Sequence, residues 1–148
     1  MSASNKTVYS FETMLREHGY IVYTCNGTSM MPLLRQQKDI VEIRPLKTRP
    51  SKYDVILYKR NGSYILHRIL KVLPDGYLIA GDHNTFTEND ISEEMILGKM
   101  VRVYRNGKSI YPTNLLYRIY VHLWCDCYPL RMFILKCKAK VISYMRKA

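Results

Sequence analysis

Three residues of this chain have the types that acyl-transfer catalysis requires, and they follow one another as Ser29, His67 and Asp82. A serine hydroxyl is a weak nucleophile until a neighbouring base takes its proton, and a third group usually orients that base. An imidazole with an ordinary pKa of about 6.5 can accept this proton at physiological pH. The three residues are therefore candidates for the nucleophile, base and carboxylate of acyl-transfer catalysis.

The sequence around the serine and the histidine suits these roles. Ser29 follows a strand-like run and precedes Pro32, which indicates a bend that exposes the hydroxyl. His67 alternates with Ile65 and Ile69, so a strand places these three side chains on one face. A polar ring on an otherwise apolar face needs a partner, and we expect a carboxylate to provide it.

Two carboxylates are candidates for that partner. Asp82 comes directly after an apolar run, and Asp90 lies a short way downstream. Each is able to orient His67 or to hold the loop by accepting backbone hydrogen bonds, and the sequence leaves the choice open. His83 is a second ring beside Asp82, and Arg68 is expected to pair with a carboxylate on the opposite face of the strand.

Together these segments resemble the conserved boxes of the type I signal peptidases and their relatives, which include the self-cleaving LexA-type repressors. The Ser-Met-x-Pro box of that superfamily matches residues 29–32, and its Gly-Asp-Asn-Asn box resembles residues 81–84. The general base precedes an arginine, and here the pair is His67-Arg68. Histidine in place of lysine makes the chain similar to the Ser-His branch, which is the archaeal and endoplasmic-reticulum type.

The resemblance implies a serine endopeptidase that cleaves an extended leader or signal-like peptide after small residues, through an acyl-enzyme. It assigns the nucleophile to Ser29 and the base to His67 rather than His83, with Asp82 or Asp90 as the assisting acid. Oxyanion donors and the substrate groove would come from the residues around the nucleophile. These are the Ser29 amide, Thr28, Met30, Met31 and Pro32.

The resemblance implies no metal or organic cofactor, and the expected partner is a peptide or precursor protein. His122 with Cys125, Cys127 and Cys137 forms a conceivable zinc set, but the Cys-x-Cys spacing is not the common knuckle. Only 28 residues precede Ser29, and they contain neither a long apolar run nor room for a DNA-binding domain. We therefore expect a catalytic core without its usual N-terminal attachment.

Two alternatives to the peptidase stay open. One is a non-catalytic relative that binds peptide or membrane with the same fold. The other is a LexA-like regulator associated with nucleic acid, which only the net charge of +11 favours. The absence of lysine at position 67 weighs against the regulator, so nucleic acid is not an expected partner.

The spacing of hydrophobic residues and the positions of turn residues predict a mainly β fold for residues 1–112. Apolar spacing indicates a short helix from Phe11 to His18, ending near Gly19. Strands are predicted at residues 20–25, 39–44, 53–59, 63–72, 77–80 and 95–105. Tight turns at Asn61-Gly62 and Asn106-Gly107 favour an antiparallel, partly closed β-fold, which agrees with the signal-peptidase and LexA-like fold that the resemblance implies.

Residues 113–148 are predicted to form a tail of two basic amphipathic helices, separated near Pro129. This tail has seven Lys and Arg residues against one Asp, a net charge of +6. Its charge is attracted to anionic membrane surfaces, while packing on the β-core is an equal alternative. We see no secretory signal and no convincing membrane span, so we expect a cytoplasmic protein that can attach to a membrane surface.

Overall fold

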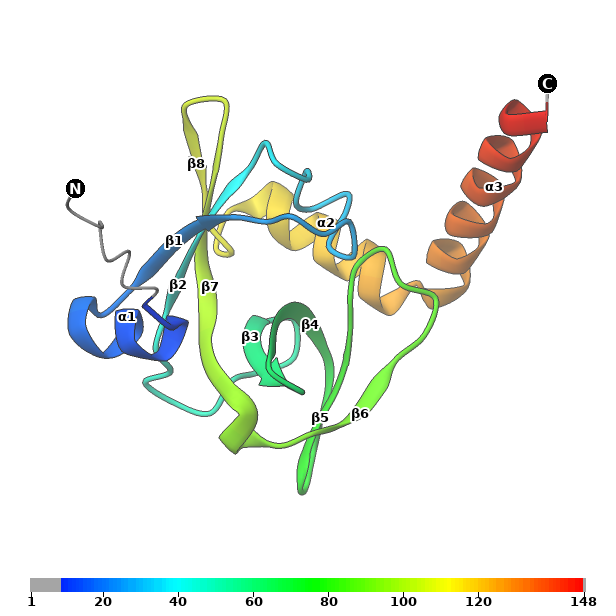
Figure 1. Cartoon of the computed structure of the whole chain (residues 1–148). Helices are drawn as coiled ribbons and strands as arrows, with labels where there is room; N and C mark the ends of the chain where they lie inside the picture. Colours follow the sequence, from blue (N-terminus) through cyan, green and yellow to red (C-terminus); the bar gives the residue numbers. More distant parts are fainter. Residues whose placement is uncertain (1–8, 148) are drawn as a thin grey trace.

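The computed structural model of the protein describes residues 9–147, so residues 1–8 of the polar N-terminal segment lie outside the described part. Within that part, eight strands form one antiparallel sheet in the order β1-β2-β7-β3-β4-β5-β6, and β8 pairs with β7 (Figure 1). The strands are β1 (Ile21–Thr24), β2 (Ile40–Arg44), β3 (Val55–Arg60), β4 (Ser63–Leu73), β5 (Gly76–Ala80), β6 (Glu88–Ile91), β7 (Ile96–Arg105) and β8 (Lys108–Ile110).

The predicted antiparallel β-fold is confirmed, but the expected partial closure is not. β1 and β6 are the two ends of the strand path, and within the described residues they do not pair with each other. Each of them has four residues. The sheet therefore stays open between its two short end strands.

Two turns join neighbouring strands as the sequence predicts. Between β3 and β4, Asn61 and Gly62 have φ angles of 49° and 77°. Between β7 and β8, Asn106 and Gly107 have φ angles of 50° and 74°. A two-residue hairpin of type I′ needs positive φ at both central positions, which asparagine and glycine adopt at low cost.

The sequence analysis did not predict two of the strands, β6 and β8. β6 has the sequence Glu-Asn-Asp-Ile and buries only Ile91, so it lacks the β-branched alternation of a typical strand. It forms because Ile91 pairs with Tyr77 of β5 and Glu88 pairs with Ile79. Pairing and packing here override a weak intrinsic preference for strand. The short β8 likewise forms by pairing with the end of β7.

The two faces of the sheet bury separate hydrophobic clusters. β3 contributes Leu57 to one cluster and Ile56 to the other, because successive side chains point to opposite faces. The larger cluster also receives Leu15 from α1 (Phe11–His18). The smaller cluster lies between β3, β4, β5, β6 and β7, and its members are Ile56, Tyr58, Ile69, Tyr77, Ile79, Ile91 and Ile96.

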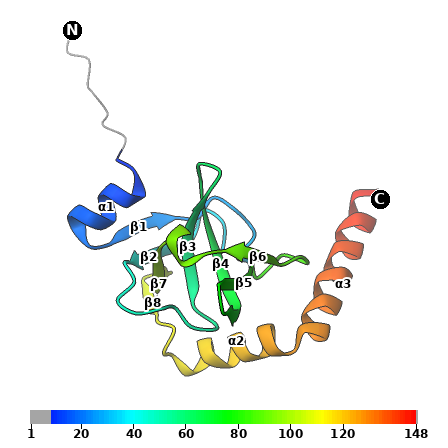
Figure 2. The same cartoon turned by 90° about the horizontal axis from the view of Figure 1, so that it is seen from below.

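Helices follow the sheet at the C-terminal end, as predicted: α2 (Leu115–Asp126) and α3 (Tyr128–Lys147). α2 is not separate from the β-domain, because Tyr117 and Val121 belong to the larger cluster. Pro129 lies in the first turn of α3, where its missing N–H costs no helical hydrogen bond. Figure 2 shows α2 along one side of the sheet and α3 turning away from it. None of the helices within residues 9–147 is long and apolar enough to cross a bilayer.

Candidate active site

Ser29 lies in a turn that follows β1 and is partly exposed, while its neighbour Met30 is buried in the larger cluster. The amide of Met31 donates to the carbonyl of Thr28 at 3.1 Å, and the amide of Leu34 donates to Met30 at 2.9 Å. These bonds fix the backbone on both sides of the serine. Within the described residues, the hydroxyl and the amide of Ser29 make no hydrogen bond, so both stay free for another group.

The loop at residues 81–84 packs directly on the serine. The amide of His83 donates to the carbonyl oxygen of Ser29 at 2.7 Å. A Cβ atom on Gly81 would lie 2.5 Å from that same oxygen and 3.0 Å from Cβ of Ser29. Only glycine permits this approach, so the segment at residues 81–84 helps to position the serine segment at residues 29–32.

His67 lies on β4, on the face of the smaller cluster, and is 6% exposed. Its Nδ1 is 3.0 Å from Oε1 of Glu88 on β6. An ionised carboxylate only accepts hydrogen bonds, so Nδ1 carries the proton and Nε2 keeps a free lone pair in the neutral ring. This is the tautomer that a general base needs.

Tyr58 completes this hydrogen-bonded group from β3. Its hydroxyl donates to Glu88, at 3.2 Å from Oε1 and 3.3 Å from Oε2, and lies 3.2 Å from Nδ1 of His67. Arg60 also donates to Oε2 of Glu88, at 2.7 Å. Glu88 is therefore held from two sides in the position where it meets the imidazole.

Burial lowers the pKa of His67 below its ordinary value of 6.5, and the charge and hydrogen bond of Glu88 oppose this effect. Burial dominates because the ring lies inside the face of the sheet. A lowered pKa keeps the imidazole neutral at physiological pH. The histidine is thus ready to accept a proton without a metal ion or a second base.

Asp82 does not lie beside His67. Its carboxylate accepts two hydrogen bonds from Arg68, at 2.8 and 2.7 Å, and both side chains are fully buried. Tyr120 of α2 also donates to it, at 2.8 Å. Trp124 donates to the Asp82 carbonyl at 2.7 Å. Arg68 therefore has the structural pairing expected of it, and Asp82 anchors the loop to the sheet and to α2.

Asp90 is an exposed residue of β6 whose carboxylate accepts from Arg60 at 2.6 Å. Neither Asp82 nor Asp90 hydrogen-bonds to His67, so the carboxylate beside the ring is not one of the two expected from the sequence. Glu88 takes that place because it is the first residue of β6 and pairs with Ile79 of β5, and it shares a face of the strand with Asp90. The period-2 relation of Glu88 and Asp90 was the available signal in the sequence.

The residues around the serine divide between different surfaces. Met30 lines a hollow of about 160 Å³ together with Ser29, between the 23–30 segment and β4. Pro32 lines a different hollow, beside α2. Thr28 is exposed, and Met31 is partly exposed. Of the three side chains expected to shape the groove, Met30 alone lies in the hollow that contains the serine.

This serine-containing hollow adjoins a second one of about 450 Å³. Both are lined by Tyr23, Asn26, Gly27 and Tyr64. In β4, residues 63–67 pair with β3 on one edge, whereas pairing with β5 on the other edge begins only at Arg68. Within the described residues, that second edge of 63–67 has no strand partner. β1 pairs with β2 alone. The two hollows therefore form a groove between two strand edges that are free to pair.

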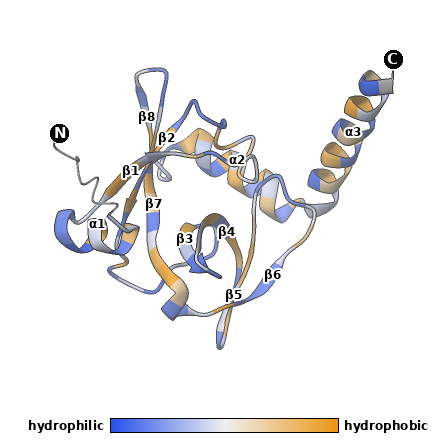
Figure 3. Ribbon diagram, viewed as in Figure 1, coloured by the Kyte–Doolittle hydropathy of each residue, from blue (hydrophilic) through white to orange (hydrophobic). Residues whose placement is uncertain are grey.

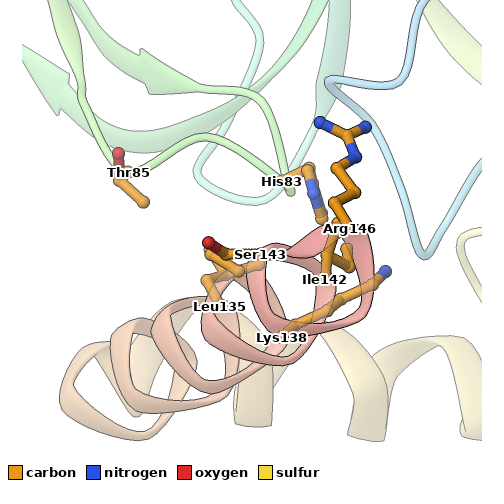
Figure 4. Close-up of a pocket in the computed structure, with 8 residues that line it drawn as sticks. His83, Thr85, Leu135, Lys138, Ile142, Ser143 and Arg146 are labelled. Carbon is orange, nitrogen blue, oxygen red and sulfur yellow. The ribbon is translucent and has the colours of Figure 1, made fainter. Parts of the chain in front are cut away.

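His83, the rival ring, lies at a different surface from the serine hollow. It lines a pocket of about 470 Å³ between the 81–85 loop and α3, with Lys138 and Arg146 on the helix side (Figure 4). Burial lowers the pKa of His83, and the nearby charges of Lys138 and Arg131 lower it further. Among the described residues, no carboxylate hydrogen-bonds to this ring, so it lacks the orienting partner of His67.

Arg131 on α3 is a site residue that the sequence did not reveal. It is 1% exposed, and its Nη2 donates to the carbonyls of Gly81 at 2.6 Å and Asn84 at 2.7 Å. Nε and Nη1 are buried without a hydrogen-bond partner in the described part of the chain. The one available signal was a single arginine within an apolar stretch of helix.

The structure thus joins the serine turn to the 81–84 loop and joins His67 to Glu88. Between residues 9 and 147, no hydrogen bond links the Ser29 hydroxyl to His67. Hydrogen bonds between nucleophile and base are often long or poorly aligned without substrate and tighten when it binds. Over the same residues, no group of three or more His, Cys, Asp and Glu side chains is placed to hold a metal ion, and His122 instead contacts Asp126.

Comparison with family models finds no match to this chain, and comparison with curated proteins finds no significant relative. The site must therefore be interpreted from its own geometry.

Proposed function

We propose that this chain is a serine endopeptidase of the type I signal peptidase kind, with the corresponding fold. The observation that carries the proposal is the 3.0 Å contact between Nδ1 of His67 and Oε1 of Glu88. It orients the ring and leaves Nε2 as the basic nitrogen, which is the role of the acid in a serine-histidine-carboxylate triad. Ser29 is the nucleophile, because within residues 9–147 neither its hydroxyl nor its amide makes a hydrogen bond.

The substrate is an extended peptide that binds as an added strand. The groove between the 23–27 segment and the free edge of β4 offers backbone donors and acceptors on both sides. The hollow beside Ser29 measures about 160 Å³, which favours a small side chain next to the scissile bond. These features support cleavage after small residues.

Catalysis begins when Oγ of Ser29 attacks the scissile carbonyl carbon and Nε2 of His67 takes the hydroxyl proton. Glu88 stabilises the imidazolium that forms, and Tyr58 holds Glu88 in place. The negative charge passes to the carbonyl oxygen. The free amide of Ser29 donates to that oxygen, and Thr28 is close enough in sequence to assist.

Collapse of the tetrahedral intermediate breaks the peptide bond, and His67 gives its proton to the leaving amine. Water then enters, loses a proton to Nε2 and attacks the acyl-enzyme. Release of the acid restores Ser29 and the neutral ring. The balanced reaction is peptide-bond hydrolysis, and it uses only groups of this chain.

A leader peptide of a precursor protein is the substrate class that we propose, because such leaders present an extended segment with small residues at the cleavage point. The test is incubation of the purified protein with a serine-directed acylating probe and, in parallel, with a library of extended peptides containing small-residue sites. We expect a mass adduct on Ser29 and cleavage, both absent in Ser29→Ala and His67→Ala.

Matched controls separate chemistry from folding. Ser109→Ala removes an exposed serine of β8, and His83→Ala removes the rival ring, so both should keep the adduct and the cleavage. Adduct formation that persists in Ser29→Ala would exclude this nucleophile. Peptide binding without cleavage, unchanged in folded Ser29→Ala, would instead favour the non-catalytic relative.

A further inference from the structure

α3 contacts the rest of the protein along one narrow side only. Within the described residues, Arg131 and Leu135 are its buried side chains. Further along, the pocket of about 470 Å³ separates the helix from the 81–85 loop (Figure 4). Figure 1 shows the C-terminal half of α3 standing clear of the sheet. Within residues 9–147, nothing covers the rest of the surface of this helix.

Apolar residues occupy much of that uncovered surface. At 100° per residue they form one continuous stripe, centred about 120° round the helix from Arg131 and Leu135. We call it the outer stripe; its members are Leu130, Phe133, Ile134, Cys137, Val141, Tyr144 and Met145. Phe133 is 67% exposed, Val141 58% and Tyr144 78%. Figure 3 shows hydrophobic and hydrophilic residues alternating along α3 as this arrangement requires.

The residues that flank the outer stripe are basic. Lys136 and Lys140 lie along one edge of it, and Lys138 lies along the other. Over its whole length, α3 has six basic residues and no acidic residue. A partner surface that carries negative charges above an apolar layer would match both the lysines and the outer stripe.

α2 provides an informative contrast. It also exposes apolar residues on the side away from the core, namely Leu115, Leu116, Ile119 and Leu123. Its charges are a single Arg118 and a single Asp126, and Asp126 is already paired with Lys52 at 2.8 Å. Charge complementarity to an anionic surface therefore belongs to α3 and not to both helices.

We propose that the outer stripe of α3 docks on an anionic lipid surface, with its apolar side chains among the acyl chains and its lysines at the phosphate level. Helices with this division of residues lie in the plane of a bilayer interface rather than across it. Lysines near such a surface add attraction that salt weakens. This proposal stands independently of the peptidase activity.

Flotation of the full chain with phosphatidylcholine vesicles, with and without phosphatidylserine, tests the proposal. We expect binding to the vesicles that contain phosphatidylserine, weakening as sodium chloride is added. Phe133→Asp with Val141→Asp should remove the binding. Lys136→Glu with Lys140→Glu should weaken it about tenfold or more, since each lysine near the surface contributes measurably. Circular dichroism would show that these exposed substitutions preserve the fold.

The control is Lys47→Glu with Lys108→Glu, which changes net charge equally at exposed positions away from α3 and should leave most of the binding. Equal binding to both kinds of vesicle, or binding unaffected by Phe133→Asp with Val141→Asp, would overturn the proposal. So would self-association that the same aspartates abolish while no vesicle binding is seen, because a second copy would then cover the stripe. Tight duplex DNA binding without vesicle binding would also overturn it.

Discussion

Nη2 of Arg131 lies 2.6 Å from the carbonyl oxygen of Gly81, so the last helix holds the loop on which Ser29 rests. The same loop contains Asp82, and its carboxylate forms an ion pair with Arg68 of the sheet. From His83 a backbone hydrogen bond of 2.7 Å reaches the serine itself. The C-terminal helices thus contact the candidate active site, which agrees with packing on the β-core, one of the two alternatives that the sequence left open.

Replacing Glu88 with glutamine should reduce kcat/KM on a cleaved peptide by about a hundredfold to ten-thousandfold, because a neutral amide cannot stabilise the imidazolium. Asp90→Asn is the matched control on the same face of β6 and should change kcat/KM by less than about threefold, since Asp90 is exposed and its partner in the described residues is the half-buried Arg60. Steady-state kinetics of the two variants measure the difference. A larger loss in Asp90→Asn would return the orienting role to that residue.

The acid limb of the kcat/KM profile should inflect below pH 6.5, because burial lowers the pKa of His67 below that ordinary value. Activity rises with pH as the ring loses its proton, so the limb reports the free imidazole. In Glu88→Gln the inflection should move to still lower pH, since the charge that opposes the effect of burial is gone. An inflection above 6.5 in the unaltered protein would contradict this assignment.

Asp82→Asn should destabilise the fold by about 3–5 kcal/mol, because it leaves the buried guanidinium of Arg68 without its counter-charge. Asp90→Asn should cost less than about 1 kcal/mol, as an exposed pair contributes little. Urea unfolding followed by circular dichroism compares the two free energies of unfolding. Equal losses in the free energy of unfolding for the two variants would mean that Asp82 does not anchor the loop.

Gly81→Ala should impair catalysis by displacing the serine turn. The added Cβ would meet the Ser29 carbonyl oxygen at 2.5 Å, and a backbone atom cannot move aside as a flexible side chain would. Gly27→Ala is the matched control, because its Cβ would meet no atom within 4 Å. Circular dichroism should show that both variants fold. We expect Gly81→Ala alone to lose adduct formation on Ser29.

Arg131→Met should lower kcat/KM at least about tenfold while changing the melting temperature little. The carbonyls of Gly81 and Asn84 lose their donor, which loosens the loop. The free energy of folding changes less, because the arginine is buried with Nε and Nη1 unpartnered within the described residues, and removing such a charge offsets the lost bonds. Arg118→Met, on the exposed side of α2, should change neither quantity. A large drop in melting temperature at unchanged activity would make Arg131 purely structural.

The sequence by itself determined most of the local elements. Alternation and Asn-Gly pairs predicted the β3–β4 and β7–β8 turns and the face that His67 shares with Ile69, since these depend only on neighbouring residues. Helical spacing likewise predicted α1 and both C-terminal helices. The predicted pairing of Arg68 with a carboxylate on the other face followed from the same period of two.

Tertiary structure alone decided which groups meet. Glu88 reaches His67 because β6, a polar strand without a clear pattern, pairs with β5 through Tyr77 and Ile91. Arg131 reaches the carbonyl of Gly81 because α3 begins right after α2 has packed on the core. Local sequence fixes the direction of a side chain within its element, but contacts between distant elements depend on pairing register and on how helices pack. The carboxylate beside the histidine and the arginine behind the serine loop could therefore not be predicted from the chain alone.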